Sequence, residues 1–233
     1  MLILILTESA LETVPQGLRR HPSIQRHSKR RGKHPQFLLL DRSYHHTAMK
    51  TLEEGEKRGR PDIIHFALLE ALSSPLNKEG LLQTYVHTIQ DYVITVKPET
   101  RLPRNYLRFV GLVEQLFESG RVPLSGPALL KLEHKTMPQL LREIKPNYVT
   151  VFSRKGKCRL LEETVSRLSD KERPAVVIGG FPHGHFSETI IRLAKEVICI
   201  DQKMLEAWTV TSRVIYEYER SLSLPLKRLK LLS

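Results

Sequence analysis

The sequence predicts an α/β fold built on a mostly parallel β-sheet. Two observations lead to it: short runs of Val, Ile and Leu recur along the chain, and amphipathic segments of helical length separate them. Apolar runs without polar alternation are typical of strands that helices cover on both faces, the usual environment of parallel strands. The chain has 233 residues, 40% of them hydrophobic, which is enough for one elaborated domain or two small ones.

The predicted elements alternate along almost the whole chain. The opening run Leu2–Leu6 is too short for a signal peptide and has no positive residues before it, so we expect a buried strand. The predicted strands are Leu2–Leu6, Phe37–Leu40, Tyr92–Val96, Tyr148–Phe152, Ala175–Ile178 and Val197–Ile200. The predicted helices lie near residues 61–72, 103–118, 136–145, 160–169, 187–195 and 204–219.

Net charge is the strongest compositional signal. Lys and Arg total 37 against 25 Asp and Glu, which gives a formal net charge of +12. Such an excess predicts a polyanionic partner, either a nucleic acid or an anionic membrane. No apolar stretch approaches the roughly 20 residues of a membrane-spanning helix, which disfavours the membrane.

Cysteine and histidine usage predicts no metal site. Cys158 and Cys199 form neither a disulfide framework nor a metal-binding spacing, and this usage fits the reducing cytoplasm. His183 and His185 likewise have no further ligand at a suitable spacing.

The most basic segment is Gln16–Gln36. It holds seven Lys and Arg residues and three His, with no Asp or Glu. A compact core does not bury so many uncompensated charges. We therefore expect a solvated loop or arm, inserted at about residues 16–36 within the first α/β unit.

A glycine-rich loop follows the predicted strand that ends at Ile178. Gly179 and Gly180 allow a tight turn, and Ser187 is placed to cap the next helix, with Glu188 in its first turn. Ligands of open α/β sheets bind at such carboxyl ends of strands. The loop lacks the Gly-Lys-Ser/Thr of a P-loop, and it comes too late in the chain for an ordinary dinucleotide-binding fold. A ligand-binding loop and a tight turn without ligand both remain open.

Arginines form two sets around predicted helix starts. Arg60 precedes a proline suited to the first turn of a helix, and Asp62 is close enough to hold the Arg60 guanidinium in one orientation. Arg104 and Arg108 are four residues apart and so share a helix face, with Arg101 preceding that helix on the same side. Such guanidiniums fit an external anion such as an RNA backbone. Helix capping by Asp62 and an ordinary solvated basic face are the alternatives.

Five short strings resemble a known family. They are Arg60-Pro61-Asp62-Ile63-Ile64-His65, Ser74-Pro75-Leu76-Asn77, Thr100-Arg101-Leu102-Pro103-Arg104, Arg108-Phe109-x-Gly111-Leu112 and Gly179-Gly180-Phe181-Pro182-His183-Gly184. In this order, over nearly the whole chain, they resemble the small-subunit rRNA pseudouridine N1-methyltransferases of the SPOUT superfamily. The chain looks like an archaeal-type member, without the N-terminal extension of eukaryotic ones.

The resemblance implies a fold and a cofactor. The fold is a single SPOUT methyltransferase domain over residues 1–233, with a C-terminal trefoil knot, a topology otherwise almost absent from proteins. The cofactor is S-adenosyl-L-methionine. Family members often have a proline near position 204, which this chain lacks. The expected cofactor contacts are Gly179, Gly184, Ile200, Asp201, Gln202, Lys203, Met204 and Leu205.

The resemblance also implies the substrate and the partners. The RNA-contacting arginines correspond to Arg60, Arg101, Arg104 and Arg108. Asp62 corresponds to the acid that orients an arginine, so Asp62 and Arg60 are the expected catalytic pair. The implied partners are small-subunit ribosomal RNA and a second copy of the chain in a homodimer. Ribosomal proteins or assembly factors are left open as further partners.

The implied reaction is methylation of N1 of a pseudouridine in small-subunit ribosomal RNA, together with a role in small-subunit assembly. The N1 nitrogen must lose its proton before or during attack, and no residue stands out as the general base. Two alternatives stay open. One is a related SPOUT methyltransferase acting on a ribose 2′-hydroxyl or on tRNA; the other is a non-enzymatic rRNA-binding assembly factor.

Overall fold

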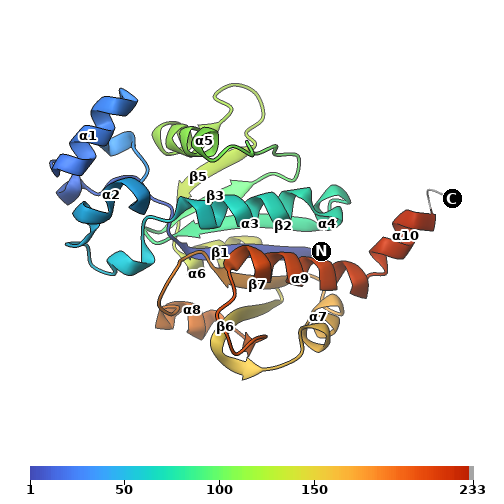
Figure 1. Ribbon diagram of the computed structural model, residues 1–233. Helices are drawn as coiled ribbons and strands as arrows, with labels where there is room; N and C mark the ends of the chain where they lie inside the picture. The colour runs from blue at the N-terminus through green and yellow to red at the C-terminus, as the bar shows by residue number, and fades with distance from the viewer. Residues whose placement is uncertain (231–233) are drawn as a thin grey trace.

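The structure contains one mixed β-sheet with helices on both faces (Figure 1). It is a computed structural model that describes residues 1–230. Within these residues the sheet has eight strands in the order β4-β5-β3-β2-β1-β7-β6-β8. The strands are β1 (Leu2–Ser9), β2 (Leu82–Thr88), β3 (Tyr92–Val96), β4 (Arg121–Val122), β5 (Leu130–His134), β6 (Tyr148–Cys158), β7 (Pro174–Gly179) and β8 (Glu196–Cys199).

The sheet has a parallel part and an antiparallel edge. Strands β2, β1, β7, β6 and β8 are parallel to one another. Strands β3, β5 and β4 extend the sheet with antiparallel pairs. The predicted α/β fold with a mostly parallel sheet is confirmed, whereas the antiparallel edge was not predicted.

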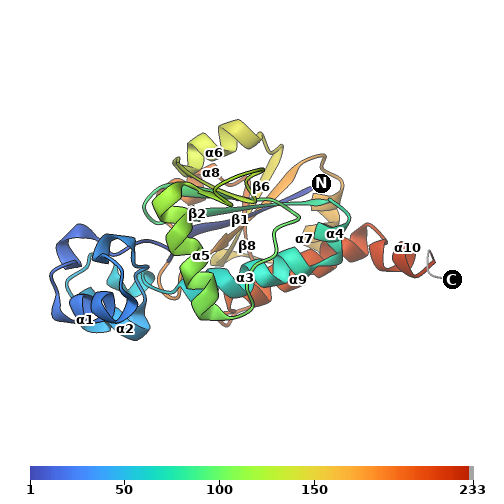
Figure 2. The same ribbon diagram turned by 90° about the horizontal axis from the view of Figure 1, so that it is seen from above.

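Helices cover both faces of the sheet, and Figure 2 shows the two layers from above. The helices are α1 (Pro22–Arg31), α2 (Arg42–Met49), α3 (Pro61–Ser73), α4 (Pro75–Lys78), α5 (Tyr106–Ser119), α6 (Met137–Ile144), α7 (Leu161–Ser169), α8 (Glu188–Leu193), α9 (Ala207–Ser221) and α10 (Leu224–Lys230). Leu2, Leu4 and Leu6 of β1 pack into one core with residues of α3, α5, α7 and α9. Ile3 and Ile5 pack into the opposite core with residues of α6 and α8. Among the described helices, none combines the length and the hydropathy needed to cross a lipid bilayer.

Helix boundaries follow local sequence signals. Pro61 is the first residue of α3, as predicted, because its fixed φ suits a helix start and its missing N–H has no intrahelical partner there. Thr136 and Gln139 form a reciprocal capping box at the start of α6. Gly120, at φ 75°, ends α5 in the left-handed region that glycine adopts without steric cost.

The six predicted helices and five of the six predicted strands are confirmed. The predicted strand Phe37–Leu40 is wrong: Pro35–Phe37 is a single 3₁₀ turn, and Leu39 makes only an isolated bridge with Thr13. These leucines are buried by helices rather than by strand neighbours. Strand β2 was missed because polar residues interrupt its apolar positions.

A small helical lobe projects from the sheet between β1 and α3, at the blue end of Figure 1. We call residues 11–58 the basic lobe. The expected solvated loop at Gln16–Gln36 is wrong, because α1 and two 3₁₀ turns form within this segment. The lobe has its own core, and its fully or almost fully buried residues are Val14, Leu18, Ile24, Leu38, Leu40, Ala48 and Met49.

A buried carboxylate from outside the basic lobe offsets part of its charge. Glu114 of α5 is 1% exposed, and its Oε2 lies 3.0 Å from both Arg31 Nη2 and Lys33 Nζ. Its Oε1 accepts a hydrogen bond from the Leu39 backbone N–H at 3.2 Å. Because Glu114 lies 81 residues beyond Lys33 in sequence, the composition of Gln16–Gln36 alone did not reveal this partner.

A second buried ion pair closes the base of the lobe. Arg58 donates through Nε and Nη2 to the two carboxylate oxygens of Glu12, at 2.7 and 2.6 Å. The Glu12 side chain is fully buried, and Gln90 Nε2 donates to it at 2.7 Å. The pair therefore joins the chain entering the lobe to the chain leaving it, and such a charge-assisted bidentate contact has one favoured geometry.

Two buried histidines connect α1 and α2. His27 Nδ1 and His45 Nε2 are 2.8 Å apart, and the Asp41 backbone N–H donates to His45 Nδ1 at 3.1 Å. Nδ1 of His45 is thus an acceptor, so its proton lies on Nε2 and is donated to His27. Burial, and then the charge of His27, lowers the pKa of His45 from 6.5 to about 4.

This pair predicts a pH dependence of stability. His45 is protonated in the unfolded chain below its ordinary pKa of 6.5, but in the folded chain only near 4. Between these values the unfolded state holds more protons, so the free energy of unfolding decreases as the pH falls, by up to about 1.4 kcal/mol per pH unit from this residue. Urea unfolding of the unmodified protein and of His45→Gln across this range measures the difference. Equal pH slopes in the two proteins would contradict the assignment.

Candidate functional site

A glycine loop after β7, residues 179–187, forms the first wall of the candidate site. The Gly180 N–H donates to Thr7 O at 2.9 Å, and the Ala10 N–H donates to Gly180 O at 2.8 Å, so the loop continues the pairing of β7 with β1. A Cβ at Gly180 would lie 2.3 Å from Ser9 Oγ and 2.7 Å from Ile64 Cδ1. Only glycine lets the loop pass this close to β1 and α3.

The rest of the loop leads into α8. Gly184 has φ 93°, a conformation that residues with a Cβ rarely adopt. Ser187 caps α8, with its Oγ accepting the Ile190 N–H at 3.5 Å, and Glu188 lies in the first turn, as predicted. The loop is therefore shaped by glycines at its start and middle and by a helix cap at its end.

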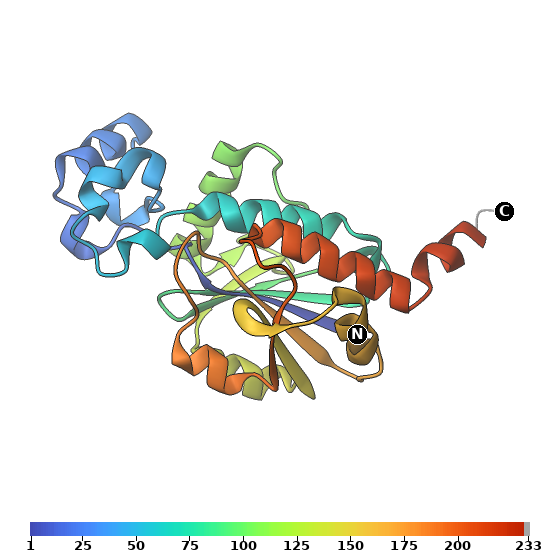
Figure 3. The same ribbon diagram turned by 60° about the horizontal axis from the view of Figure 1, so that its bottom comes forward.

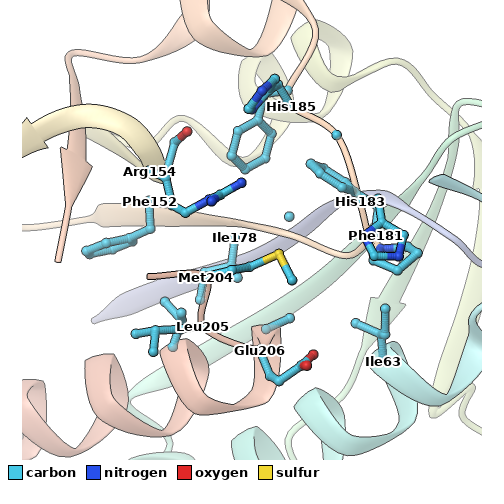
Figure 4. A pocket seen from close by; sticks show the side chains of 17 residues that line it. Ile63, Phe152, Arg154, Ile178, Phe181, His183, His185, Met204, Leu205 and Glu206 are labelled. Carbon is cyan, nitrogen blue, oxygen red and sulfur yellow. The ribbon is translucent and has the colours of Figure 1, made fainter. Parts of the chain in front are cut away.

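The glycine loop and the segment before α9 enclose a cavity of 120 Å³ (Figure 4). In Figure 4, Arg154 and Met204 extend toward the middle of the cavity, while Ile63 and Glu206 stand at the ends of two helices. A hollow of 90 Å³ adjoins it, and the residues that line both are Phe152, Ser153, Arg154, Met204, Leu205 and Val210. Both lie at the carboxyl ends of the parallel strands β6 and β7, where ligands of α/β sheets bind.

Most of the predicted cofactor residues are brought together here. Those that line the cavity are Gly179, Gly184, Met204 and Leu205. The adjoining hollow is lined by Ile200, Asp201 and Lys203, again with Met204 and Leu205. Gln202 lies outside both, in a separate surface hollow next to Cys158 and Cys199.

Sequence inspection missed Arg154 and Glu206. Phe152 pairs in register with Ile178 at the end of β7, and Arg154 lies two residues beyond Phe152. The alignment of these two parallel strand ends is the feature that could have pointed to Arg154. Glu206 is the residue immediately before α9, and its side chain makes no capping hydrogen bond. The cavity thus has the side chains of Arg154 and Glu206 in its lining, together with Ser153, His183, His185 and apolar residues.

The predicted contact between Arg60 and Asp62 is present. Arg60 Nε and Nη2 each donate to a different carboxylate oxygen of Asp62 at 2.8 Å. Hydrogen bonding to Asp62 raises the pKa of Arg60. The negative charges of Asp62, Glu206 and Asp41 raise this pKa further. The Arg60 side chain is 35% exposed. The guanidinium is held in one orientation, near Glu206 at the cavity, and remains accessible to solvent.

The second arginine set lies on the surface beside α3. Arg101, Arg104 and Arg108 are exposed, and within residues 1–230 none is in an ion pair. The prediction that Arg104 and Arg108 share a helix face is wrong, because α5 begins at Tyr106 and Arg104 precedes it. The segment is held to α3 through His65, whose Nε2 lies 2.7 Å from Pro103 O.

Comparison with known proteins gives consistent matches over most of the chain. A family model described as EMG1/NEP1 methyltransferase matches residues 4–219. The ribosomal RNA small subunit methyltransferase Nep1 of Thermococcus sibiricus is 49% identical over 222 residues, which cover 95% of this chain and 99% of that protein. The protein of the same name from Staphylothermus marinus is 48% identical over 213 residues, 91% of this chain and 92% of that protein.

A solved structure has the same fold. The crystal structure of Archaeoglobus fulgidus Nep1 bound to S-adenosylhomocysteine superposes with a TM-score of 0.84 at 41% identity. The superposition covers 95% of this chain and 98% of that one.

The space around Gly180 and Gly111 predicts opposite effects on stability when each is replaced by alanine. Gly180→Ala places a methyl group against Ser9 and Ile64 and should destabilise the protein by about 1–3 kcal/mol. Gly111 lies within α5 with no atom within 4 Å of its Cβ position, so Gly111→Ala should stabilise by about 0.5–1 kcal/mol. Thermal unfolding of both variants measures this, and a neutral Gly180→Ala would show that the loop does not need the close approach.

Proposed function

Because the chain belongs to the EMG1/NEP1 methyltransferase family, we propose that it methylates small-subunit ribosomal RNA with S-adenosyl-L-methionine as methyl donor. One observation carries the proposal: the Arg60 guanidinium, held in one orientation by Asp62, lies near a glycine-loop cavity in a chain that is 49% identical to an rRNA methyltransferase. The Nep1 structure with S-adenosylhomocysteine, the product of methyl transfer from this donor, supports the choice of cofactor.

The residues of the cavity fit the donor. Gly179 and Gly184 bring the loop backbone to the wall of the cavity, and Ile178, Phe181 and Leu205 offer apolar contact to a base. Glu206 would supply negative charge to the cationic sulfonium of a donor bound in this cavity. The donor, when bound, supplies an electrophilic methyl group. We propose the eight predicted residues as its contacts: Gly179, Gly184, Ile200, Asp201, Gln202, Lys203, Met204 and Leu205.

We propose N1 of a pseudouridine as the methyl acceptor. The chain has to hold this nitrogen about 3–3.5 Å from the methyl group, and most of the rate acceleration comes from that alignment. A base in an RNA helix reaches such a pocket only when it is flipped out of the stack. Arg60, held by Asp62, is oriented to bind the base or its phosphate, and Arg101, Arg104 and Arg108 extend the same side as an RNA-binding surface.

The finer topology is also a proposal. We infer a C-terminal trefoil knot within one domain covering residues 1–233, of which 231–233 lie outside the described residues. A Cβ at Gly156 would lie 2.6 Å from the backbone of Val197 and Ile198, so the loop of β6 passes directly against β8. Figure 3 shows this yellow loop beside the orange and red chain that leads from β8 to α9.

We propose a homodimer, with the α3 and α9 surface near the cavity as its interface. Phe66 of α3 is 46% exposed and meets Trp208 of α9 edge to face, with ring centroids 5.3 Å apart. Tyr216 of α9 is 56% exposed. Large apolar side chains gathered on one surface are typical of protein interfaces.

The cytoplasm is the compartment we expect for such a protein.

A role in small-subunit assembly is a second proposal. Exposed basic residues on the basic lobe, outside the lining of the cavity, favour RNA binding beyond what methyl transfer needs: Arg20, Arg26, Lys29 and Arg30. Methylation and assembly are compatible functions of one protein.

Matched RNAs test the proposed acceptor. Two otherwise identical fragments, one with uridine and one with pseudouridine at a single site, are incubated with enzyme and labelled donor. We expect label only in the pseudouridine RNA, because uridine has no N1–H. Equal labelling of both would favour a ribose 2′-hydroxyl acceptor. No labelling, with RNA binding retained, would leave assembly as the function.

Removal of the orienting carboxylate should separate catalysis from cofactor binding. In Asp62→Ala, Arg60 loses both hydrogen bonds that fix it, so we expect kcat to fall by about tenfold or more. The dissociation constant of S-adenosylhomocysteine should stay within about twofold, because Asp62 does not line the cavity. Glu143→Ala, which breaks the ion pair of Glu143 in α6 with Lys135 and lies outside the cavity lining, is the control. Equal loss of methyl transfer and cofactor affinity would exclude this role for Asp62.

A further inference from the structure

The glycine loop is a thin wall between two hollows. One face lines the 120 Å³ cavity, and the other lines a larger hollow of 860 Å³. Residues 184–186 line both. The start of the loop is held by β1 at Gly180, and Phe186 packs against the core, but residues 184–187 also line the larger hollow. The position of this second half of the loop therefore depends on the few side chains that contact it from the far side.

One ion pair provides those contacts. Lys57, the last residue of a 3₁₀ turn in the basic lobe, lies with Nζ 3.5 Å from Glu8 Oε2 in β1. Their side chains are only 9% and 11% exposed. Glu54 makes a further contact with Lys57 Nζ at 3.2 Å. The pair is thus well shielded from solvent. Attraction between opposite charges is stronger in such a buried position than at an exposed surface.

Lys57 contacts the start and the middle of the loop. Its Nζ lies 5.1 Å from the centroid of the Phe181 ring, in a cation–π arrangement. A Cβ placed on Gly184 would lie 3.0 Å from Lys57 Cε, so the loop backbone at Gly184 packs directly against the aliphatic part of the lysine side chain. Phe181 and Gly184 both line the cavity on the other face.

Glu8 holds the end of the loop. Its Oε1 accepts the Ser187 backbone N–H at 3.0 Å, just where the loop becomes α8. Glu8 itself has φ 48°, and the pairing of β1 with β2 shifts register between Leu6 and Ser9. A non-glycine residue in the left-handed region is uncommon and persists only where surrounding contacts fix it. Here the unusual backbone aims the carboxylate at the loop.

We propose that Glu8 and Lys57 are positioning residues that set the glycine loop for cofactor binding and couple the basic lobe to the cavity. This inference rests on the proposed use of S-adenosyl-L-methionine. The pair touches both ends and the middle of the loop but does not line the cavity, so it acts through the loop rather than on the ligand.

Charge-removing variants of the same size test the proposal. Glu8→Gln keeps an oxygen for the Ser187 N–H but loses the charge, and Lys57→Met keeps the stem. For each variant and the double variant we would measure the S-adenosylhomocysteine dissociation constant, and KM for the donor and for RNA. We expect about tenfold weaker cofactor binding and higher donor KM, with RNA KM within about twofold. The double variant should lose less affinity than the two single losses combined, because both substitutions remove the same Glu8–Lys57 ion pair.

Two controls separate positioning from general stability. Glu114→Gln removes a buried charge that pairs with Arg31 and Lys33 between the basic lobe and α5, so it should lower the melting temperature and leave cofactor affinity unchanged. Lys57→Arg retains the cation and should recover most of the affinity if Lys57→Met fails to fold. If Lys57→Arg binds the cofactor no more tightly than Glu8→Gln does, the result would count against the charge interaction.

The outcomes distinguish this proposal from the proposed function. If the unmodified protein binds S-adenosylhomocysteine and the folded variants bind it within twofold as well, the positioning role is wrong and the function stands. If Glu114→Gln loses affinity as much as Glu8→Gln, the effect is one of stability and the role is again wrong. If the unmodified protein neither binds the cofactor nor methylates RNA, the proposed function fails first.

Discussion

The candidate site depends on one stretch of backbone, the end of β1 at Ser9 and Ala10. The Ala10 N–H donates to Gly180 O, and Ala10 O accepts the Arg60 N–H at 3.2 Å. Ala10 thus binds the glycine loop through its N–H and the backbone of Arg60 through its carbonyl oxygen. Each buried backbone hydrogen bond contributes only about 1 kcal/mol net, but leaving either partner unpaired costs more, so the three segments are expected to move together.

The position of β1 in the sheet explains why this junction is rigid. β1 is flanked by β2 and β7, and residues 2–7 are fully buried because alternate side chains enter opposite cores. Thr7 continues the pattern with a polar contact, its Oγ1 lying 2.9 Å from His87 Nδ1. His87 is in turn 2.9 Å from Asp91. Polar side chains replace apolar ones where the strand leaves the core and the candidate site begins.

The sequence predicted what depends on local pattern. The run Leu2–Leu6, the glycine turn at Gly179 and Gly180 and the Arg60–Asp62 contact all involve neighbours in the chain or simple burial periodicity, and all are present. The SPOUT resemblance supplied the methyl donor and the pseudouridine, which charge and arginine spacing alone did not give.

What the sequence did not predict depends on partners far apart in the chain. The basic lobe folds because its leucines meet in a separate core and because Glu114 reaches it from α5. Arg154 becomes part of the cavity only because β6 pairs with β7. The Glu8–Lys57 pair joins residues 49 apart across the end of β1. No local pattern marks such contacts, since tertiary pairing creates them.

Amide hydrogen exchange with and without S-adenosylhomocysteine tests most directly whether Ala10 joins the two halves of the site. If the junction transmits order, cofactor binding should slow exchange at Ala10 and Gly180 and also at Arg60, whose N–H is bonded to Ala10 O. Slowing confined to the glycine loop and residues 200–205, with Arg60 unchanged, would contradict this coupling.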